Sequence, residues 1–162
     1  MARKAEQEPS EKKRPIAAVG GIIYRYSDDG SVELLLIRKR DGYWTLPKGK
    51  IKRKRGESEA DALVREVAEE VGLGGEVGQK VCTVEYTTPK RKPPRRKIVT
   101  YYLFRAADGV PRPDEREDIA EVRWVSVPEA LQSIHRDRVR QVVQEAAELL
   151  RDLQPDSQPR TA

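Results

Sequence analysis

The segment from Ser58 to Gly72 constrains the fold more than any other part of the chain. Ser58 is a good helix N-cap, and Asp61 follows three residues later as a weak capping box. Gly72 fits the position just past a helix end, where glycine adopts a left-handed conformation without strain. Apolar residues recur between them at helical spacing, at Ala60, Leu63, Val64, Val67 and Val71. The sequence therefore predicts a helix with one face on a hydrophobic core.

The second half of the same helix carries Glu66, Glu69 and Glu70, at spacings of three and four residues. Side chains at these spacings share a helix face, and each like-charge pair there costs an isolated helix about 0.2–0.5 kcal/mol. We expect the three carboxylates to lie on a different face from the apolar stripe and to point away from the core. Either water solvates this face and the repulsion is tolerated, or a positively charged partner binds there and offsets it.

Strand-like segments interleave with helical ones along the rest of the chain. The expected strands are 16–26, 32–40, 80–88, 98–106 and 120–127, and the further expected helices are 128–134 and 137–153. The proline-rich segment 89–97 is a hairpin connection or a loop. This pattern predicts an α/β (α+β) chain in which helices cover a mixed sheet. We assign residues 15–152 to one domain and expect disordered tails at 1–14 and 153–162.

Charge and composition narrow the function classes. The net charge of +5 suits an anionic partner, and two basic runs, 48–55 and 90–97, flank the acidic helix. A solvated loop is the alternative for either run alone. No apolar run is long enough to span a bilayer, and the N-terminal segment lacks the apolar stretch of a signal peptide, so we expect a cytoplasmic protein without membrane contact. Cys82 is the single cysteine and is expected to be a small core residue.

Carboxylates beside basic loops are typical of a magnesium site that binds a phosphorylated substrate. Mg²⁺ takes carboxylate oxygens, keeps several waters and completes its shell with substrate phosphate. Lys and Arg nearby then hold the rest of the polyanion. Gly49 allows a close backbone approach, so its carbonyl is a candidate additional ligand.

The stretch 49–73, GKIKRKRGESEADALVREVAEEVGL, resembles the Nudix box. Glu57, seven residues and then the letters REVAEEVGL fit the family pattern throughout. Seven residues separate Gly49 from Glu57 where the pattern has five, which we interpret as a two-residue insertion in the loop. The resemblance implies a Nudix-like α/β/α sandwich with a mixed sheet. It also implies Mg²⁺- or Mn²⁺-dependent cleavage of a phosphoanhydride bond.

The resemblance implies roles for the acidic residues by their position in the motif. Glu69 and Glu70 are the main expected metal ligands, and Glu66 is a further ligand or the base that activates water. The Gly49 carbonyl adds a ligand.

Two further features of the family map onto other positions. Glu57 is expected to pair with Arg65 and orient the helix. Some relatives take one more acid from the loop before the last strand, and Glu117 and Asp118 both remain candidates here.

The substrate class is less constrained. Segments 41–50 and 96–106 resemble diadenosine polyphosphate hydrolases, so diadenosine polyphosphates are our first expectation. The alternatives are a diphosphoinositol polyphosphate or an oxidised nucleoside triphosphate. A non-catalytic RNA- or phosphate-binding module is an alternative of another class, but the complete glutamate set argues against it. We therefore expect a polyanionic small molecule rather than nucleic acid as the partner, and a monomer or a homodimer.

Basic and aromatic residues near the motif are the candidates for substrate contact. The tyrosines offer stacking faces for adenine, with core packing as the alternative. His135, the lone histidine, is expected to be solvated or to cap the last helix. The candidate substrate-binding residues are Lys48, Lys50, Arg53, Arg55, Tyr86, Lys97 and Tyr101.

Overall fold

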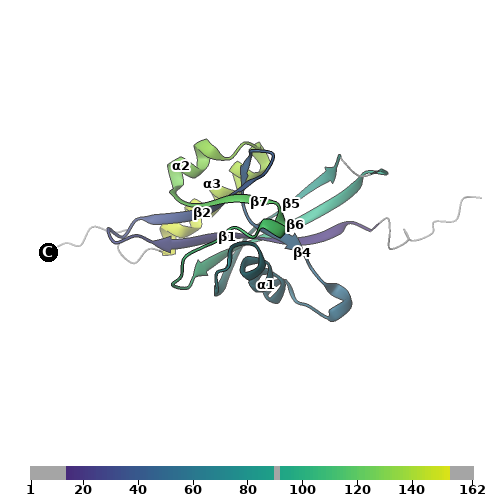
Figure 1. Ribbon diagram of the computed structural model, residues 1–162, viewed down its shortest axis with the longest axis horizontal. Helices are drawn as coiled ribbons and strands as arrows, with labels where there is room; N and C mark the ends of the chain where they lie inside the picture. The colour runs from purple at the N-terminus through teal and green to yellow at the C-terminus, as the bar shows by residue number, and fades with distance from the viewer. Residues whose placement is uncertain (1–13, 90–91, 154–162) are drawn as a thin grey trace, which may run out of the picture.

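The computed structural model describes residues 14–89 and 92–153 (Figure 1). The helices and strands are, in chain order, β1 (Ile16–Tyr26), β2 (Val32–Lys39), β3 (Trp44–Thr45), β4 (Lys48–Lys50), α1 (Glu59–Val71), β5 (Gly75–Thr88), β6 (Arg95–Ala106), β7 (Ile119–Ser126), α2 (Val127–Ser133) and α3 (Asp137–Leu153). The tails expected at 1–14 and 153–162 lie outside the described residues, except for Arg14 and Leu153. None of the helices in the described ranges has both the length and the apolar character needed to cross a membrane.

Within these ranges, seven strands form one mixed sheet. The path runs β3-β2-β1-β6-β5, with β4 paired to β1 and β7 paired to β2. β1 and β6 are parallel, from Ile16 beside Lys97 to Tyr24 beside Arg105, and the other pairs are antiparallel. β1 and β2 are central and largely buried, which explains why both appear in the sequence as nearly continuous apolar runs.

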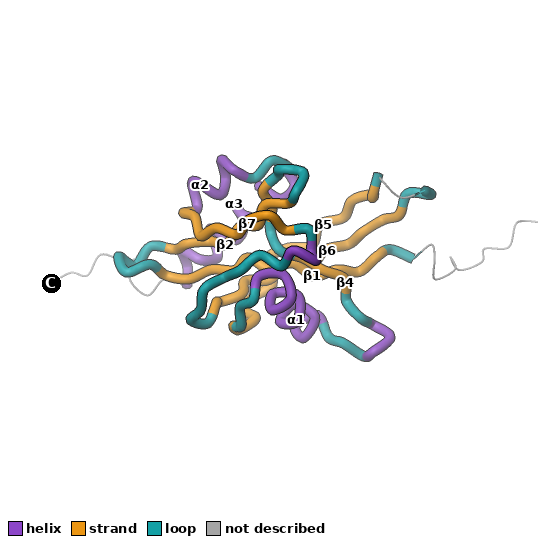
Figure 2. The backbone as a smooth tube through the Cα atoms, viewed as in Figure 1, coloured by secondary structure: helices purple, strands orange, loops and turns teal. Residues whose placement is uncertain are grey.

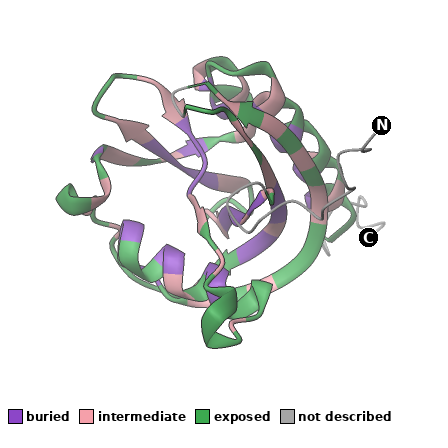
Figure 3. Ribbon diagram, turned by 90° about the vertical axis from the view of Figure 1, so that its right-hand side faces the viewer, coloured by how far each residue is buried: buried purple, intermediate pink, exposed green. Residues whose placement is uncertain are grey.

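Helices cover both faces of this sheet, as Figure 1 shows. α1 packs on one face, where Leu63 and Val67 join a core cluster with Val19 and Ile23 of β1. α2 and α3 pack on the other face, with Val142 and Val143 of α3 in the second cluster. Figure 3 shows the buried positions on the strands inside the molecule and exposed positions on the surrounding loops. The predicted α/β/α sandwich with a mixed sheet is confirmed.

The hairpin of β5 and β6 is longer than the sequence predicted, and Figure 2 traces its two strands in orange. β5 begins at Gly75, paired with Ala106, although 75–79 has no clear alternation of apolar residues. A Cβ at Gly75 would lie 2.2 Å from the Arg105 carbonyl oxygen, so this end of the hairpin depends on glycine. The proline-rich connection is also shorter than predicted, because β6 already begins at Arg95.

Helix α1 has the predicted ends but a rotated buried face. Ser58 accepts a hydrogen bond from the Asp61 backbone, and Gly72 adopts the left-handed conformation with φ of 71°. Ala60 and Val64 are exposed, however, and Ala62 is buried in their place. The prediction for those two residues was wrong because two glutamates occupy part of the buried face.

Candidate active site

Helix α1 places two of the three motif glutamates against the sheet. Glu66 and Glu70 are 8% and 3% exposed, whereas Glu69 is at the surface. Glu66 and Glu70 are one turn apart, and Glu66 faces Gly49 of β4. The prediction that all three glutamates point away from the core was therefore wrong for Glu66 and Glu70.

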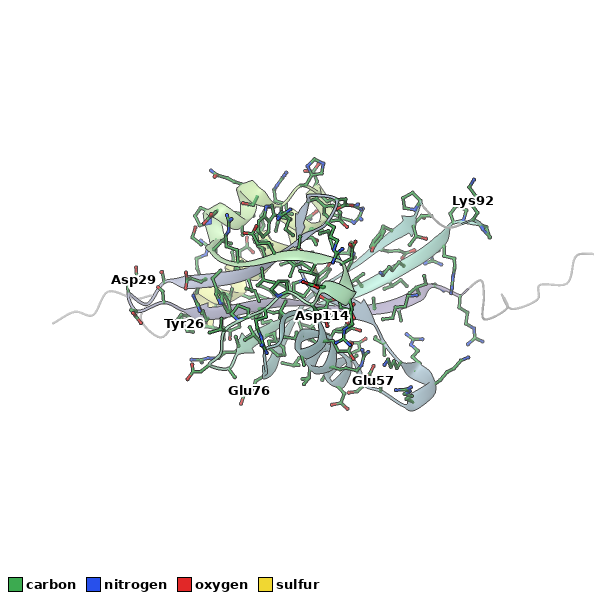
Figure 4. All side chains as sticks on the ribbon, in the orientation of Figure 1. Tyr26, Asp29, Glu57, Glu76, Lys92 and Asp114 are labelled. Carbon is green, nitrogen blue, oxygen red and sulfur yellow. The ribbon has the colours of Figure 1, made fainter. Side chains whose placement is uncertain are left out.

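Arg65 joins the glutamates to the loop that precedes the helix. Its Nε and Nη2 donate to the two carboxylate oxygens of Glu57 at 2.7 and 3.0 Å. Its Nη1 donates to Glu66 Oε1 at 2.7 Å and to Glu69 Oε2 at 3.2 Å. The hydrogen bonds from Arg65 lower the pKa of Glu57 to about 2. Glu57 and Arg65 therefore form the expected pair, and one guanidinium offsets part of the repulsion between Glu66 and Glu69 (Figure 4 labels Glu57).

Gly49 lies directly against Glu66. In β4 it pairs with Val19 of β1, and a Cβ at this position would lie 1.9 Å from Glu66 Cδ. Only glycine fits there without displacing the carboxylate. The longer loop continues beyond Gly49 into a short 3-10 helix, Arg53–Arg55, so the two extra residues leave Gly49 next to Glu66.

Glu70 is the most buried glutamate of α1. Among the described residues its Oε2 is buried without a hydrogen-bond partner. Burial, with the nearby charge of Glu66 adding to it, raises the pKa of Glu70 to about 8. Burial likewise raises the pKa of Glu66. A buried oxygen with a spare lone pair beside a second carboxylate fits a hard divalent cation such as Mg²⁺ or Mn²⁺.

The carboxylates near the pocket do not converge on a single point. Across ranges 14–89 and 92–153, no three His, Cys, Asp or Glu side chains are placed so that they could hold a metal ion together. Glu69 is at the surface, where it accepts a hydrogen bond from Arg65, and it does not line the pocket that contains Glu66 and Glu70. The ligand roles of all the candidate acids, and of the Gly49 carbonyl, stay predictions.

The structure separates the two acids offered by the loop before β7. Glu117 lines the same pocket as Glu66 and Glu70. Asp118 is in the left-handed conformation, with φ of 60°, and its Oδ1 lies 3.6 Å from Arg40 Nε at the surface. Glu117 is therefore the candidate that the fold brings to the glutamates of α1.

The acidic residues form one side of a cavity of about 330 Å³, which we call the charged pocket. Cations from four parts of the chain line it as well. Burial lowers the pKa of Lys48 to about 8 and also lowers the pKa of Lys97. The pocket thus presents carboxylates and cations to the same small space. Its basic lining residues are Lys39, Lys48, Lys50, Lys97, Arg136 and Arg138.

Both candidate tyrosines are engaged by other residues of the protein. Lys48 Nζ donates to the Tyr86 hydroxyl at 2.7 Å, and Arg138 Cζ lies 3.9 Å from the Tyr86 ring centroid. Tyr86 therefore supports two cations of the pocket. Tyr101 is 2% exposed and packs over Gly20, where a Cβ would lie 2.4 Å from its ring. The prediction that Tyr101 stacks on a base was wrong, and its alternative as a core aromatic is correct.

Four other residues singled out from the sequence do not line the charged pocket. Arg53 and Arg55 do not line it, and instead line a separate groove that also includes Lys50. Their expected contact with a substrate held beside the glutamates is therefore not supported. His135 is exposed. Cys82 is half-buried against the core beneath α3, as expected for a small packing residue.

Sequence reasoning missed four residues of the pocket: Lys39, Tyr43, Arg136 and Arg138. Lys39 ends β2, and the two arginines lie where α3 begins, more than sixty residues after the acidic helix. Arg136 Cζ is 4.9 Å from the Tyr43 ring centroid. The segment HRDR at 135–138 contains two arginines, but only the tertiary fold brings them into the same pocket as Glu70.

Comparisons with known proteins agree with this architecture. A family model described as the NUDIX domain matches residues 14–146. The MutT4 protein of Mycobacterium tuberculosis is 34% identical over 147 residues, and the match covers 86% of this chain but 57% of that relative. The asymmetrical bis(5'-nucleosyl)-tetraphosphatase of Rattus norvegicus is 29% identical over 146 residues, with 83% of this chain and 95% of that protein covered.

Among solved structures, the NUDIX domain of NrtR from Shewanella oneidensis, determined with ADP ribose, superimposes with a TM-score of 0.71. The alignment covers 90% of this chain and 95% of that one at 20% identity, so it supports the fold. The match of the family model to most of the chain, together with the glutamate motif on α1, places this protein in the Nudix family.

Proposed function

We propose that this protein is a divalent-metal-dependent hydrolase that cleaves a phosphoanhydride bond in nucleoside polyphosphates, with diadenosine polyphosphates as the first candidates. The observation that carries the proposal is the charged pocket, where Glu66, Glu70 and Glu117 line one small cavity together with six lysines and arginines. A divalent cation with a phosphate chain is the ligand that satisfies both sides at once.

Residues of the acidic side would hold the metal. Glu70 contributes its unpartnered oxygen, Glu66 lies beside it, and Glu117 shares the cavity. Glu69 joins them by exchanging its contact with Arg65, and the Gly49 carbonyl is the expected backbone ligand. When bound, Mg²⁺ or Mn²⁺ supplies neutralisation of phosphate charge and a lower pKa for coordinated water.

Residues of the basic side would bind and orient the phosphate chain. Lys48 and Lys97 are held in the partly buried pocket, and Lys48 is fixed by its hydrogen bond to Tyr86. Arg138, which packs on Tyr86, and Arg136, which packs on Tyr43, add planar guanidinium groups suited to phosphate oxygens. Positive groups prearranged in this way stabilise the charge that shifts toward the leaving phosphate.

The substrate preference rests on the 29% identity to the rat tetraphosphatase and on the number of cations. A pocket with six basic lining residues suits a substrate with several phosphates. An oxidised nucleoside triphosphate would need polar groups converging on the base. Thr45 and Tyr43 are the neutral residues of the described lining with side-chain hydrogen-bonding groups, so this alternative has less support.

Product analysis tests the proposal. The purified protein is incubated with diadenosine tetraphosphate, a diphosphoinositol polyphosphate or oxidised dGTP, with Mg²⁺, Mn²⁺ or EDTA. We expect metal-dependent hydrolysis that is fastest with diadenosine tetraphosphate, and a loss of at least roughly a hundredfold in Glu70→Gln. Glu76→Gln, an exposed glutamate of β5, is the matched control and should keep full activity.

Two results would overturn the proposal in different ways. Preferred hydrolysis of another substrate class would replace diadenosine polyphosphates. No turnover with either metal, together with tight salt-dependent RNA binding, would instead support the non-catalytic alternative.

A further inference from the structure

A second cavity, of about 820 Å³, lies outside the charged pocket and carries only positive charge in its side chains. We call it the basic groove. It runs between the start of β1, the loop after β4 and the first residue of β6, and Lys50 is the residue it shares with the charged pocket. In Figure 1 these segments lie at one end of the molecule. The lining residues are Arg14–Ala17, Lys50–Arg55 and Arg95.

The cations of the groove stand on an anchored loop. The Ile51 backbone donates to the Ala17 carbonyl at 3.1 Å, which fixes the loop to β1. The Lys52 backbone donates to Glu57 Oε1 at 2.9 Å, and Gly56 closes the 3-10 turn with φ of 69°. The inserted segment therefore has defined contacts at both ends, and its basic side chains face one cavity.

Within the part of the chain that the structure describes, most cations of this loop have no acidic partner. Among the described residues, Lys50, Arg53, Lys54 and Arg55 form no ion pair with Asp or Glu, and no acidic residue lines the groove. Elsewhere on the surface such pairs are common, for example Arg38 with Glu121. Like charges gathered in one cavity repel each other, and an external polyanion removes that cost.

The chemistry of the lining indicates what kind of polyanion fits. Surfaces that bind single-stranded nucleic acid combine cations with aromatic rings on which the bases stack. The described lining of the groove has no aromatic residue, and its floor consists of Pro15, Ile16, Ala17 and Ile51. The cations are arginines and lysines in alternation along the loop, and both bind phosphate oxygens, arginine through its planar fork and lysine as a point charge.

We propose that the basic groove is a second binding site, separate from the charged pocket, for a linear polyphosphate chain without bases. Arg53, Lys54 and Arg55 hold the chain on one wall, and Lys50 leads from the groove toward the charged pocket. The two-residue insertion thus extends the reach of the protein along a phosphate chain. Binding at the groove requires neither a metal nor hydrolysis.

Direct binding to medium-chain inorganic polyphosphate tests this inference without relying on activity. The Glu70→Gln protein is used in EDTA, so that the probe stays intact and a failure of the proposed hydrolase function cannot affect the result. Lys54→Ala/Arg55→Ala removes two cations of the groove. Lys80→Ala/Arg151→Ala is the control, because it removes the same charge from exposed positions outside the groove.

We expect the groove variant to bind polyphosphate roughly tenfold more weakly and to lower the slope of log affinity against log salt by about 1.4, which counterion release predicts for two lost contacts. The control should change the affinity by less than about twofold, because charges far from the site are screened. The charge-retaining variant Lys54→Arg/Arg55→Lys should restore binding. Equal weakening in the control, or equal affinity for a single-stranded RNA of the same phosphate number, would overturn the proposal.

Discussion

The contact between Gly49 and Glu66 gives the sharpest test of how the site is built. In Gly49→Ala the new methyl group would lie 1.9 Å from Glu66 Cδ and 2.2 Å from Oε2. Ordinary contacts between such atoms are near about 3.5 Å. Gly49 does not have a positive φ, so backbone strain plays no part and the whole effect comes from this overlap.

Two responses are open to the variant, and both are costly. If the surroundings hold Glu66 in place, overpacking in a dense interior costs about 1–3 kcal/mol. If Glu66 turns away, it gives up its 2.7 Å bond to Arg65, and a charge-assisted hydrogen bond contributes about 1.5–3 kcal/mol. We therefore expect the free energy of unfolding to fall by about 2–3 kcal/mol, with loss of metal-dependent turnover.

Urea denaturation and single-turnover hydrolysis measure the two effects. Gly74→Ala is the matched control, because a Cβ there meets no atom within 4 Å and the residue is close to the same helix. It should leave activity intact and change stability by less than about 1 kcal/mol. A Gly49→Ala protein within about 0.5 kcal/mol of wild type and fully active would refute the reasoning.

Other predictions address the acids and the thiol. Because burial raises the pKa of Glu70 to about 8 from the ordinary 4.5, the folded metal-free protein keeps a proton that the unfolded chain has released. The contribution of Glu70 to stability is therefore greatest below about pH 4.5 and is lost as pH rises from there through 8, by on the order of 5 kcal/mol in urea titrations with EDTA. Glu70→Gln should remove most of this fall, and an unchanged pH profile would contradict the assignment. Glu117→Gln should weaken Mn²⁺ binding in calorimetry by at least roughly tenfold, while Asp118→Asn, which loses only a surface contact with Arg40, should not. Burial raises the pKa of Cys82 to about 12, so alkylation by iodoacetamide should be much slower than for a free thiol, and rapid labelling of the folded protein would show otherwise.

The helix at the centre of the site illustrates what could be predicted from sequence. Its ends follow from local chemistry, since the Ser58 hydroxyl and the glycine at 72 act on their own neighbours. The face that the helix turns toward the core cannot be predicted in this way. The periodicity of apolar residues treats every glutamate as facing solvent, including the buried ones. Ala60 and Val64 were assigned to the core for that reason, although the space they would take is occupied by the row of Glu66 and Glu70.

The basic side of the pocket was only partly predictable for a related reason. Lys48 is close to the glutamate motif in the sequence, so proximity pointed to it correctly. Arg136 and Arg138 reach the pocket only because α3 packs on the face of the sheet opposite α1. The stacking role predicted for Tyr101 was wrong because strand alternation cannot tell which face of β6 borders a cavity. The Tyr101 ring instead packs over Gly20 in the core.

The charged pocket contains both carboxylates and cations, and contacts within the described residues do not neutralise all of them. Arg65 balances Glu57 and part of Glu66 and Glu69, but the buried oxygen of Glu70 has no protein donor among the described residues. A polyanion entering alone would be repelled by these carboxylates, and a metal ion entering alone would meet the field of the surrounding lysines and arginines. Each ligand therefore offsets the charge that opposes the other. Groups held ready for such a pair reduce stability in the empty protein, which is the usual compromise between stability and function.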